Sequence, residues 1–142
     1  MKVAAIQMVS GISLDANLSE ALRLLRQAAA AGAEIAVLPE YFCFMGMKDE
    51  DKLVIAETEG LGRVQDFLID ASRDLKLCLV GGTLPMATDD PAHAANASLA
   101  FDAKGHRISR YDKIHLFRYD NGRESYDEAA VLRAGDTPTA FE

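Results

Sequence analysis

The alternation of apolar and polar positions divides the first part of the chain into short buried strands and an amphipathic helix. Residues 2–9 form a near-continuous apolar run, which is typical of a buried strand. Capping residues at 13–17 precede apolar positions at helical spacing, and Gly32 is expected to close that helix. Residues 34–38 predict a second buried strand. A strand, a helix and a strand of these lengths indicate a parallel, right-handed crossover unit.

The pattern continues with a long loop, a second helix and a third strand. After Glu40, about twenty residues lack a clear period, and loops of that length in compact domains are usually functional or carry structure of their own. Apolar residues at helical spacing from Val64 to Leu75 predict the helix, and the apolar run at residues 77–84 predicts the strand.

The pattern of apolar and polar residues changes after residue 91. Two short runs, residues 94–102 and 106–112, flank a turn at 103–105, which predicts an antiparallel hairpin. Beyond Lys113 the chain is polar and irregular as far as Val131, and residues 135–138 predict a further turn. The pattern therefore indicates a mixed α/β architecture rather than a simple repetition of crossover units.

Composition and charge limit the possible classes of protein. The 142 residues, 49% hydrophobic, suffice for one domain that buries about two-thirds of its unfolded surface. A net charge of −7 argues against nucleic acid or a membrane as the main partner. The absence of a long apolar run and the two isolated cysteines favour a cytoplasmic, reduced protein. Three histidines without paired cysteines argue against a metal site.

Three charged residues are candidates for chemistry. Glu40 follows Pro39 at the end of a predicted strand and precedes two aromatic residues, so it is either a general base or a solvated loop residue. Lys113 lies among apolar residues at a strand end, where a lysine either snorkels to the surface or stabilises a developing negative charge. Glu124, beside Arg123, is the third candidate, although alone it is typical of a solvated loop.

Taken together, these segments resemble the nitrilase or carbon–nitrogen hydrolase superfamily. Residues 38–40, 113–117 and 124–125 occur in the order and approximate spacing of that family. The opening strand at 3–8, the segment 81–83 and the segment 96–99 also look like family segments. The resemblance covers essentially the whole chain. In the general character of its sequence, the chain looks most like the omega-amidase and deaminated-glutathione amidase branch.

The resemblance implies a fold and a mechanism. The fold class is α/β (α+β), a four-layer α–β–β–α sandwich with a mixed sheet, and residues 1–142 correspond to the N-terminal part of its single domain. Glu40 matches a general base for a cysteine thiol, Lys113 a cation that holds the oxyanion, and Glu124 a carboxylate that orients the lysine and substrate. The implied substrate is a small aliphatic amide, no cofactor is needed, and a homo-oligomer is expected.

The chain departs from the family at the nucleophile. The family places a cysteine on a strand shortly after its second glutamate, but no cysteine follows Glu124 here, and Cys43 and Cys78 lie on other segments. We therefore expect a fragment, a truncated frame or half of a split protein that is inactive alone. The alternative is a non-catalytic half-domain that binds a partner chain through an exposed sheet face. A flavodoxin-like binding domain is least favoured, because of the predicted hairpin and the missing phosphate loop.

Overall fold

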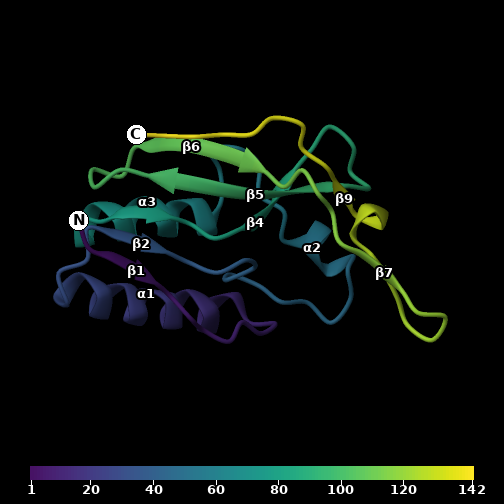
Figure 1. Ribbon diagram of the computed structural model, residues 1–142, viewed down its shortest axis with the longest axis horizontal. Helices are drawn as coiled ribbons and strands as arrows, with labels where there is room; N and C mark the ends of the chain where they lie inside the picture. The colour runs from purple at the N-terminus through teal and green to yellow at the C-terminus, as the bar shows by residue number, and fades with distance from the viewer.

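A seven-stranded mixed sheet with two helices on one face forms the body of the molecule (Figure 1). The computed structural model describes residues 1–142. The elements in chain order are β1 (Val3–Ala5), α1 (Leu14–Ala30), β2 (Ile35–Val37), α2 (Asp51–Val54), α3 (Arg63–Leu75), β3 (Cys78–Val80), β4 (Leu84–Ala87), β5 (Ala94–Phe101), β6 (Arg107–Asp112), β7 (Arg118–Asp120), β8 (Ser125–Asp127), the 3-10 turn η1 (Glu128–Ala130) and β9 (Leu132–Arg133).

The predicted crossover unit is present, with β1, β2 and β3 paired in parallel. Helix α1 begins where the Ser13 hydroxyl accepts a hydrogen bond from the amide of Ala16, which satisfies one of the free amides of the first turn. It ends before Gly32, whose φ of +81° is the left-handed conformation expected after a helix. Strand β1 covers only part of the apolar run predicted at residues 2–9.

The single strand predicted at residues 77–84 is wrong, because the run divides into β3 and β4. Gly82 lies between them with φ +56°, and a Cβ at this position would lie 2.0 Å from the carbonyl oxygen of Pro39. The chain therefore leaves the sheet to pack closely against the loop that follows β2. It then returns as β4, which pairs antiparallel with β5.

Strand β5 organises the second half of the sheet. The predicted hairpin is confirmed, since β5 and β6 pair antiparallel. Strands β3 and β4 share one edge of β5, whereas β6 and β9 share the other. Beyond Lys113, a region predicted to be irregular, β7 and β8 form a separate hairpin in which Tyr119 faces Tyr126. The long loop after Glu40 also contains the short helix α2.

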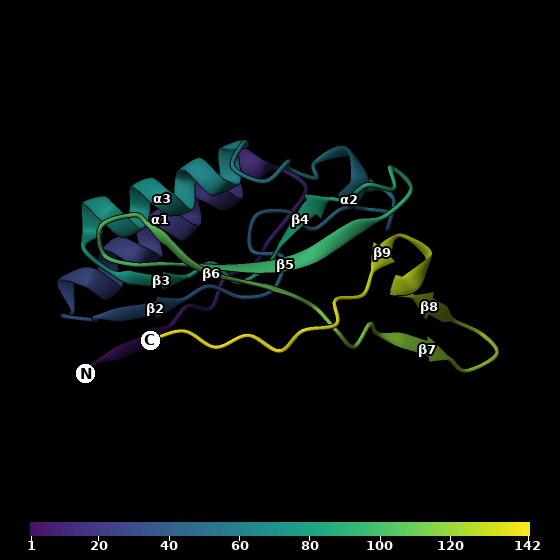
Figure 2. The same cartoon turned by 90° about the horizontal axis from the view of Figure 1, so that it is seen from above.

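The hydrophobic core lies between the helices and one face of the sheet. Its members include Leu25 of α1, Leu68 of α3, and Leu79, Leu99 and Phe101 of the sheet. Figure 2 shows α1 and α3 on the same side of the sheet, with the C-terminal segment passing along the other side. No helix of the structure is long and apolar enough to cross a membrane.

The opposite face of β1, β2 and β3 carries two rows of apolar side chains without a covering helix. Register pairing places Val3, Ile35 and Cys78 in one row and Ala5, Val37 and Val80 in the next. Their neighbours along the strands, Ala36 and Leu79, are fully buried toward the helices. Val3 remains 53% exposed, and the rows as a whole are exposed or half-buried. We call these six residues the open sheet face.

Candidate active site

Glu40 lies just beyond the carboxyl end of β2, in a loop that the neighbouring strands hold in place. The amide of Leu38 still donates to the carbonyl of Val80 at 2.9 Å, which continues the sheet pairing beyond β2. The next anchor is the amide of Tyr41, which donates to the Thr83 hydroxyl at 2.9 Å. Tyr41 has φ +51°, a strained conformation for a non-glycine residue. This turn of the backbone leaves the Glu40 side chain half-exposed, at 49%.

Lys113 follows β6 and brings its ammonium between two carboxylates. Its Nζ lies 3.1 Å from Oε1 of Glu40 and 2.9 Å from Oε2 of Glu128. The Lys113 side chain is 23% exposed and that of Glu128 is 14% exposed. The structure therefore brings together two of the three residues expected from the sequence, Glu40 and Lys113, although they are far apart in the chain.

The two carboxylates keep Lys113 charged. Burial acts to lower the pKa of the ammonium, but the hydrogen bonds and negative charges of Glu128 and Glu40 outweigh it and leave the pKa raised. A lysine with a raised pKa is cationic throughout the neutral range. The site thus contains a fixed positive charge beside a half-exposed carboxylate, which suits stabilisation of an oxyanion next to a proton acceptor.

Asn96 of β5 completes the contacts of Glu40. Its Nδ2 donates to Oε1 of Glu40 at 2.8 Å, and its backbone carbonyl accepts from the amide of Lys113 at 2.9 Å. In the sequence, this asparagine is part of a segment that looks like the family, with no role expected for it. The available signal was an amide side chain within a mostly apolar, alanine-rich strand.

The structure places Glu124 away from this cluster. It lies in the turn between β7 and β8, exposed, and its backbone amide donates to Oδ1 of Asn121 at 2.8 Å. No ion pair joins its side chain to Lys113. The carboxylate beside Lys113 belongs instead to Glu128, at the start of η1, and the amide of Phe117 donates to its Oε2 at 2.7 Å.

The hairpin explains why Glu128, rather than Glu124, lies beside Lys113. Because β7 and β8 run out and back, the residues at the base of the hairpin approach Lys113, whereas its turn points away. The amide of Glu128 donates to the carbonyl of Phe117 at 3.0 Å, which closes this base. The hairpin therefore carries Glu124 away in its turn and brings Glu128 to Lys113 at its base.

Neither cysteine is suited to act as a nucleophile at this site. Cys43 is fully buried in the core, and burial raises the pKa of its thiol to about 12. Cys78 pairs in register with Ile35, at the start of β3, whereas Glu40 follows the opposite end of the parallel strand β2. Burial, together with the charge of Asp102, also raises the pKa of Cys78. No group of three or more His, Cys, Asp or Glu side chains is arranged to hold a metal ion.

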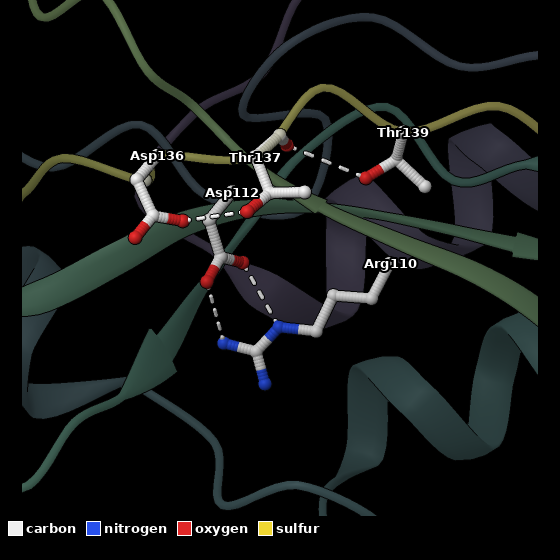
Figure 3. A pocket seen from close by; sticks show the side chains of 6 residues that line it. Arg110, Asp112, Asp136, Thr137 and Thr139 are labelled. Carbon is white, nitrogen blue, oxygen red and sulfur yellow. Dashed lines mark hydrogen bonds and ion pairs between the residues drawn. The ribbon is translucent and has the colours of Figure 1, made fainter.

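A polar cleft of about 310 Å³ lies beside the C-terminal segment (Figure 3). Arg110, the cation that lines it, is engaged by both oxygens of Asp112 and by Glu59 at 2.6 Å. Its charge is thus already balanced within the protein. Gly135, which also lines the cleft, donates its amide to the carbonyl of Lys113 at 2.9 Å. Gly135 at the edge of the cleft therefore supports the backbone of Lys113. The cleft offers no unpaired cation, because Arg110 is already paired.

Comparisons with known proteins find similar sequences and similar solved structures. A family model described as carbon–nitrogen hydrolase matches residues 2–142. A chloroplastic omega-amidase from Arabidopsis thaliana is 30% identical over 130 residues, which are 89% of this chain and 35% of that protein. A deaminated glutathione amidase from Synechocystis is 30% identical over 141 residues, 97% of this chain and 51% of that protein.

The solved structures include a member of branch 10 of the nitrilase superfamily from Saccharomyces cerevisiae. It superimposes with a TM-score of 0.83 at 27% identity, over 99% of this chain and 51% of that one. The chain thus spans about half the length of this structure and of the Synechocystis protein, and about a third of the Arabidopsis protein.

Proposed function

The chain belongs to the carbon–nitrogen hydrolase family, with relatives in the omega-amidase and deaminated glutathione amidase branch, and on that premise we propose that its site hydrolyses the amide bond of a small aliphatic substrate. The observation that carries the proposal is the ammonium of Lys113 between the carboxylates of Glu40 and Glu128. A cation held in this way is available to stabilise negative charge, and a half-exposed carboxylate beside it is available to exchange protons.

The proposed reaction passes through a thioester. Glu40 takes the proton of a cysteine thiol, and the thiolate attacks the amide carbon to give a tetrahedral oxyanion beside Lys113. When the oxyanion collapses, the carbon–nitrogen bond breaks and Glu40 returns the proton to the departing amine. Water, deprotonated by Glu40, then attacks the thioester and releases the acid and the thiol. Glu128 keeps the ammonium charged and in position, the role first expected for Glu124.

The proposal requires a thiol that residues 1–142 do not supply at this site. Cys43 is enclosed in the core and Cys78 lies at the other end of the strands. We therefore propose that the nucleophile comes from a polypeptide segment outside these residues, which brings a cysteine to the open side of Glu40 and Lys113.

The experiment compares two glutamate substitutions in the protein that carries both this chain and the thiol-bearing segment. We expect Glu128→Gln to lower kcat by about 100-fold or more, because Lys113 loses its more buried charge partner. The matched control Glu124→Gln should retain nearly full activity, since that side chain lies in an exposed turn. Ammonia release from short aliphatic amides is the measurement.

The result also tests the premise. Equal losses in the two variants, or a loss confined to Glu124→Gln, would contradict the role proposed for Glu128. If Glu40→Gln and Lys113→Met retain hydrolysis, the proposed site is wrong as a whole.

A second candidate function is non-catalytic, and the open sheet face favours it. The two apolar rows on β1, β2 and β3 form a surface on which a partner chain could pack. Under this alternative, Glu40→Gln and Lys113→Met leave partner binding unchanged, whereas Val37→Asp and Val80→Asp abolish it. Measured affinity for a copurifying chain, beside the hydrolysis assay, separates the two functions.

A further inference from the structure

Asn96 is a polar residue in an apolar strand, and burying its side-chain amide there costs free energy of folding. It is 1% exposed and lies among Ala94, Ala95 and Ala97 of β5, which are all buried. Its Oδ1 is buried without a hydrogen-bond partner. An unpaired buried acceptor destabilises the fold, so an apolar residue of similar shape would suit this strand better. Packing alone therefore gives no reason for an asparagine here.

The contacts of its amide group point toward Glu40. Oε1 of Glu40 receives two donors, Nδ2 of Asn96 at 2.8 Å and Nζ of Lys113 at 3.1 Å. No protein group donates to Oε2. The Glu40 carboxylate is consequently held by one oxygen, while the second oxygen remains available to a proton.

The backbone of Asn96 fixes the other partner. Its carbonyl accepts from the amide of Lys113 at 2.9 Å, at the point where the chain leaves β6. One residue of the central strand therefore contacts both charged groups, the lysine through its main chain and the glutamate through its side chain. Since β5 is paired along both edges, it is a rigid support for the two.

From this geometry we infer that Asn96 is a positioning residue, which fixes Oε1 of Glu40 beside Lys113 and leaves Oε2 as the atom that exchanges the proton. The inference rests on the proposed function, because it gives Glu40 the task of a base. Asn96 thus joins the proposed site as a residue that acts through Glu40 and does not contact the reacting atoms.

The test separates positioning from packing with Asn96→Leu, made in the protein that carries both this chain and the thiol-bearing segment. Leucine has a branched shape like that of asparagine, removes the donor to Glu40 and removes the unpaired acceptor. We expect kcat for amide hydrolysis to fall about 10- to 100-fold, the effect of one hydrogen bond to a charged group, with KM changed less than about twofold. The melting temperature should stay equal or rise. Ser98→Ala, at the next position on the same face of β5, is the control and should leave kcat unchanged.

A second measurement does not depend on activity. The order parameter of the Glu40 side chain, from 13C relaxation, should fall in Asn96→Leu and stay unchanged in Ser98→Ala. Where leucine disturbs the packing, seen as a lowered melting temperature, Asn96→Ala replaces it in both measurements.

The outcomes distinguish the two claims. If the wild-type protein hydrolyses an amide, an unchanged kcat together with an unchanged Glu40 order parameter in Asn96→Leu overturns the positioning role. If the wild-type protein hydrolyses no amide, the proposed function is lost, and the order parameter alone then decides whether Asn96 holds Glu40.

Discussion

At the scale of single residues, the site depends on a lysine whose charge is maintained by its neighbours. The Lys113 ammonium is mostly buried, which would favour the neutral amine, yet the carboxylates of Glu128 and Glu40 reverse that preference. The same contacts join segments from β2, β6 and η1. The electrostatics of the site and the stability of the fold are therefore coupled through this residue.

The raised pKa of Lys113 predicts a loss of stability at alkaline pH. Because the pKa is higher in the folded than in the unfolded protein, the stabilisation is fully present below the ordinary lysine value of about 10.4 and is lost as pH rises through the folded value. The free energy of unfolding should therefore decrease more steeply over this range in the wild type than in Lys113→Met. Denaturant titrations from neutral pH to beyond that range provide the comparison, and parallel curves for the two proteins would refute it.

The two cysteines should resist alkylation in the folded protein. Cys43 is fully buried with a pKa raised to about 12, and the pKa of Cys78 is also raised, so neither thiol is appreciably ionised near neutral pH. We expect iodoacetamide to leave Cys43 unmodified and to react slowly with Cys78, whereas both react readily in denaturant. Mass spectrometry of the digested protein measures this, and rapid native labelling of Cys43 would contradict its placement in the core.

At the scale of elements, the loop after β2 depends on the glycine between β3 and β4. Gly82→Ala should destabilise the protein by about 2–5 kcal/mol, because the residue has φ +56° and its new Cβ would overlap the carbonyl of Pro39. Gly122→Ala is the matched control, with φ +78° and no atom within 4 Å, and should cost only the backbone strain of about 1–2 kcal/mol. Chemical denaturation compares the two, and equal costs would show that the close approach to Pro39 is unimportant.

The elements also show what the sequence could and could not predict. Strong local signals located α1, α3 and the β5–β6 hairpin, because capping residues and regular apolar spacing act over a few positions. Glu40 and Lys113 were identified because each follows a predicted strand. Strand β4 was hidden in a continuous apolar run, since the break at Gly82 depends on a contact with a distant loop.

The remaining site residues depended on tertiary structure. The β7–β8 hairpin has exposed, polar strands without an apolar period, so the sequence did not reveal it, and Glu124 was expected where Glu128 is found. Asn96 is informative only once β5 is known to pass beside Glu40. Glu128 and Asn96 reach Lys113 and Glu40 through long-range pairing, which local patterns do not encode.

At the scale of the whole molecule, the helices cover only one face of the sheet. The open sheet face carries Val3, Val37 and Val80 among its members, and the C-terminal segment passes across this side without burying it fully (Figure 2). An apolar surface of this kind is rarely left bare in a soluble monomer.

We therefore predict that the chain of residues 1–142, produced alone, self-associates or aggregates. Val80→Lys should increase its monomeric fraction, because a charge on the open sheet face opposes association, whereas Val54→Lys, at the exposed end of helix α2, should have little effect. Analytical ultracentrifugation measures the fraction. A monodisperse wild-type monomer with a sharp melting transition would count against this view.

The reciprocal bonds between Phe117 and Glu128 have a practical consequence for protein engineering. They close the base of the β7–β8 hairpin at the edge of the site, so the residues between Phe117 and Glu128 form a protruding hairpin with both ends fixed. Extra residues inserted at the tip, beside Gly122, lengthen the hairpin and leave its two anchored ends where they are. The tip is consequently a permissive graft position, at which an epitope tag or a fluorophore-bearing peptide can be displayed with the charges around Lys113 undisturbed.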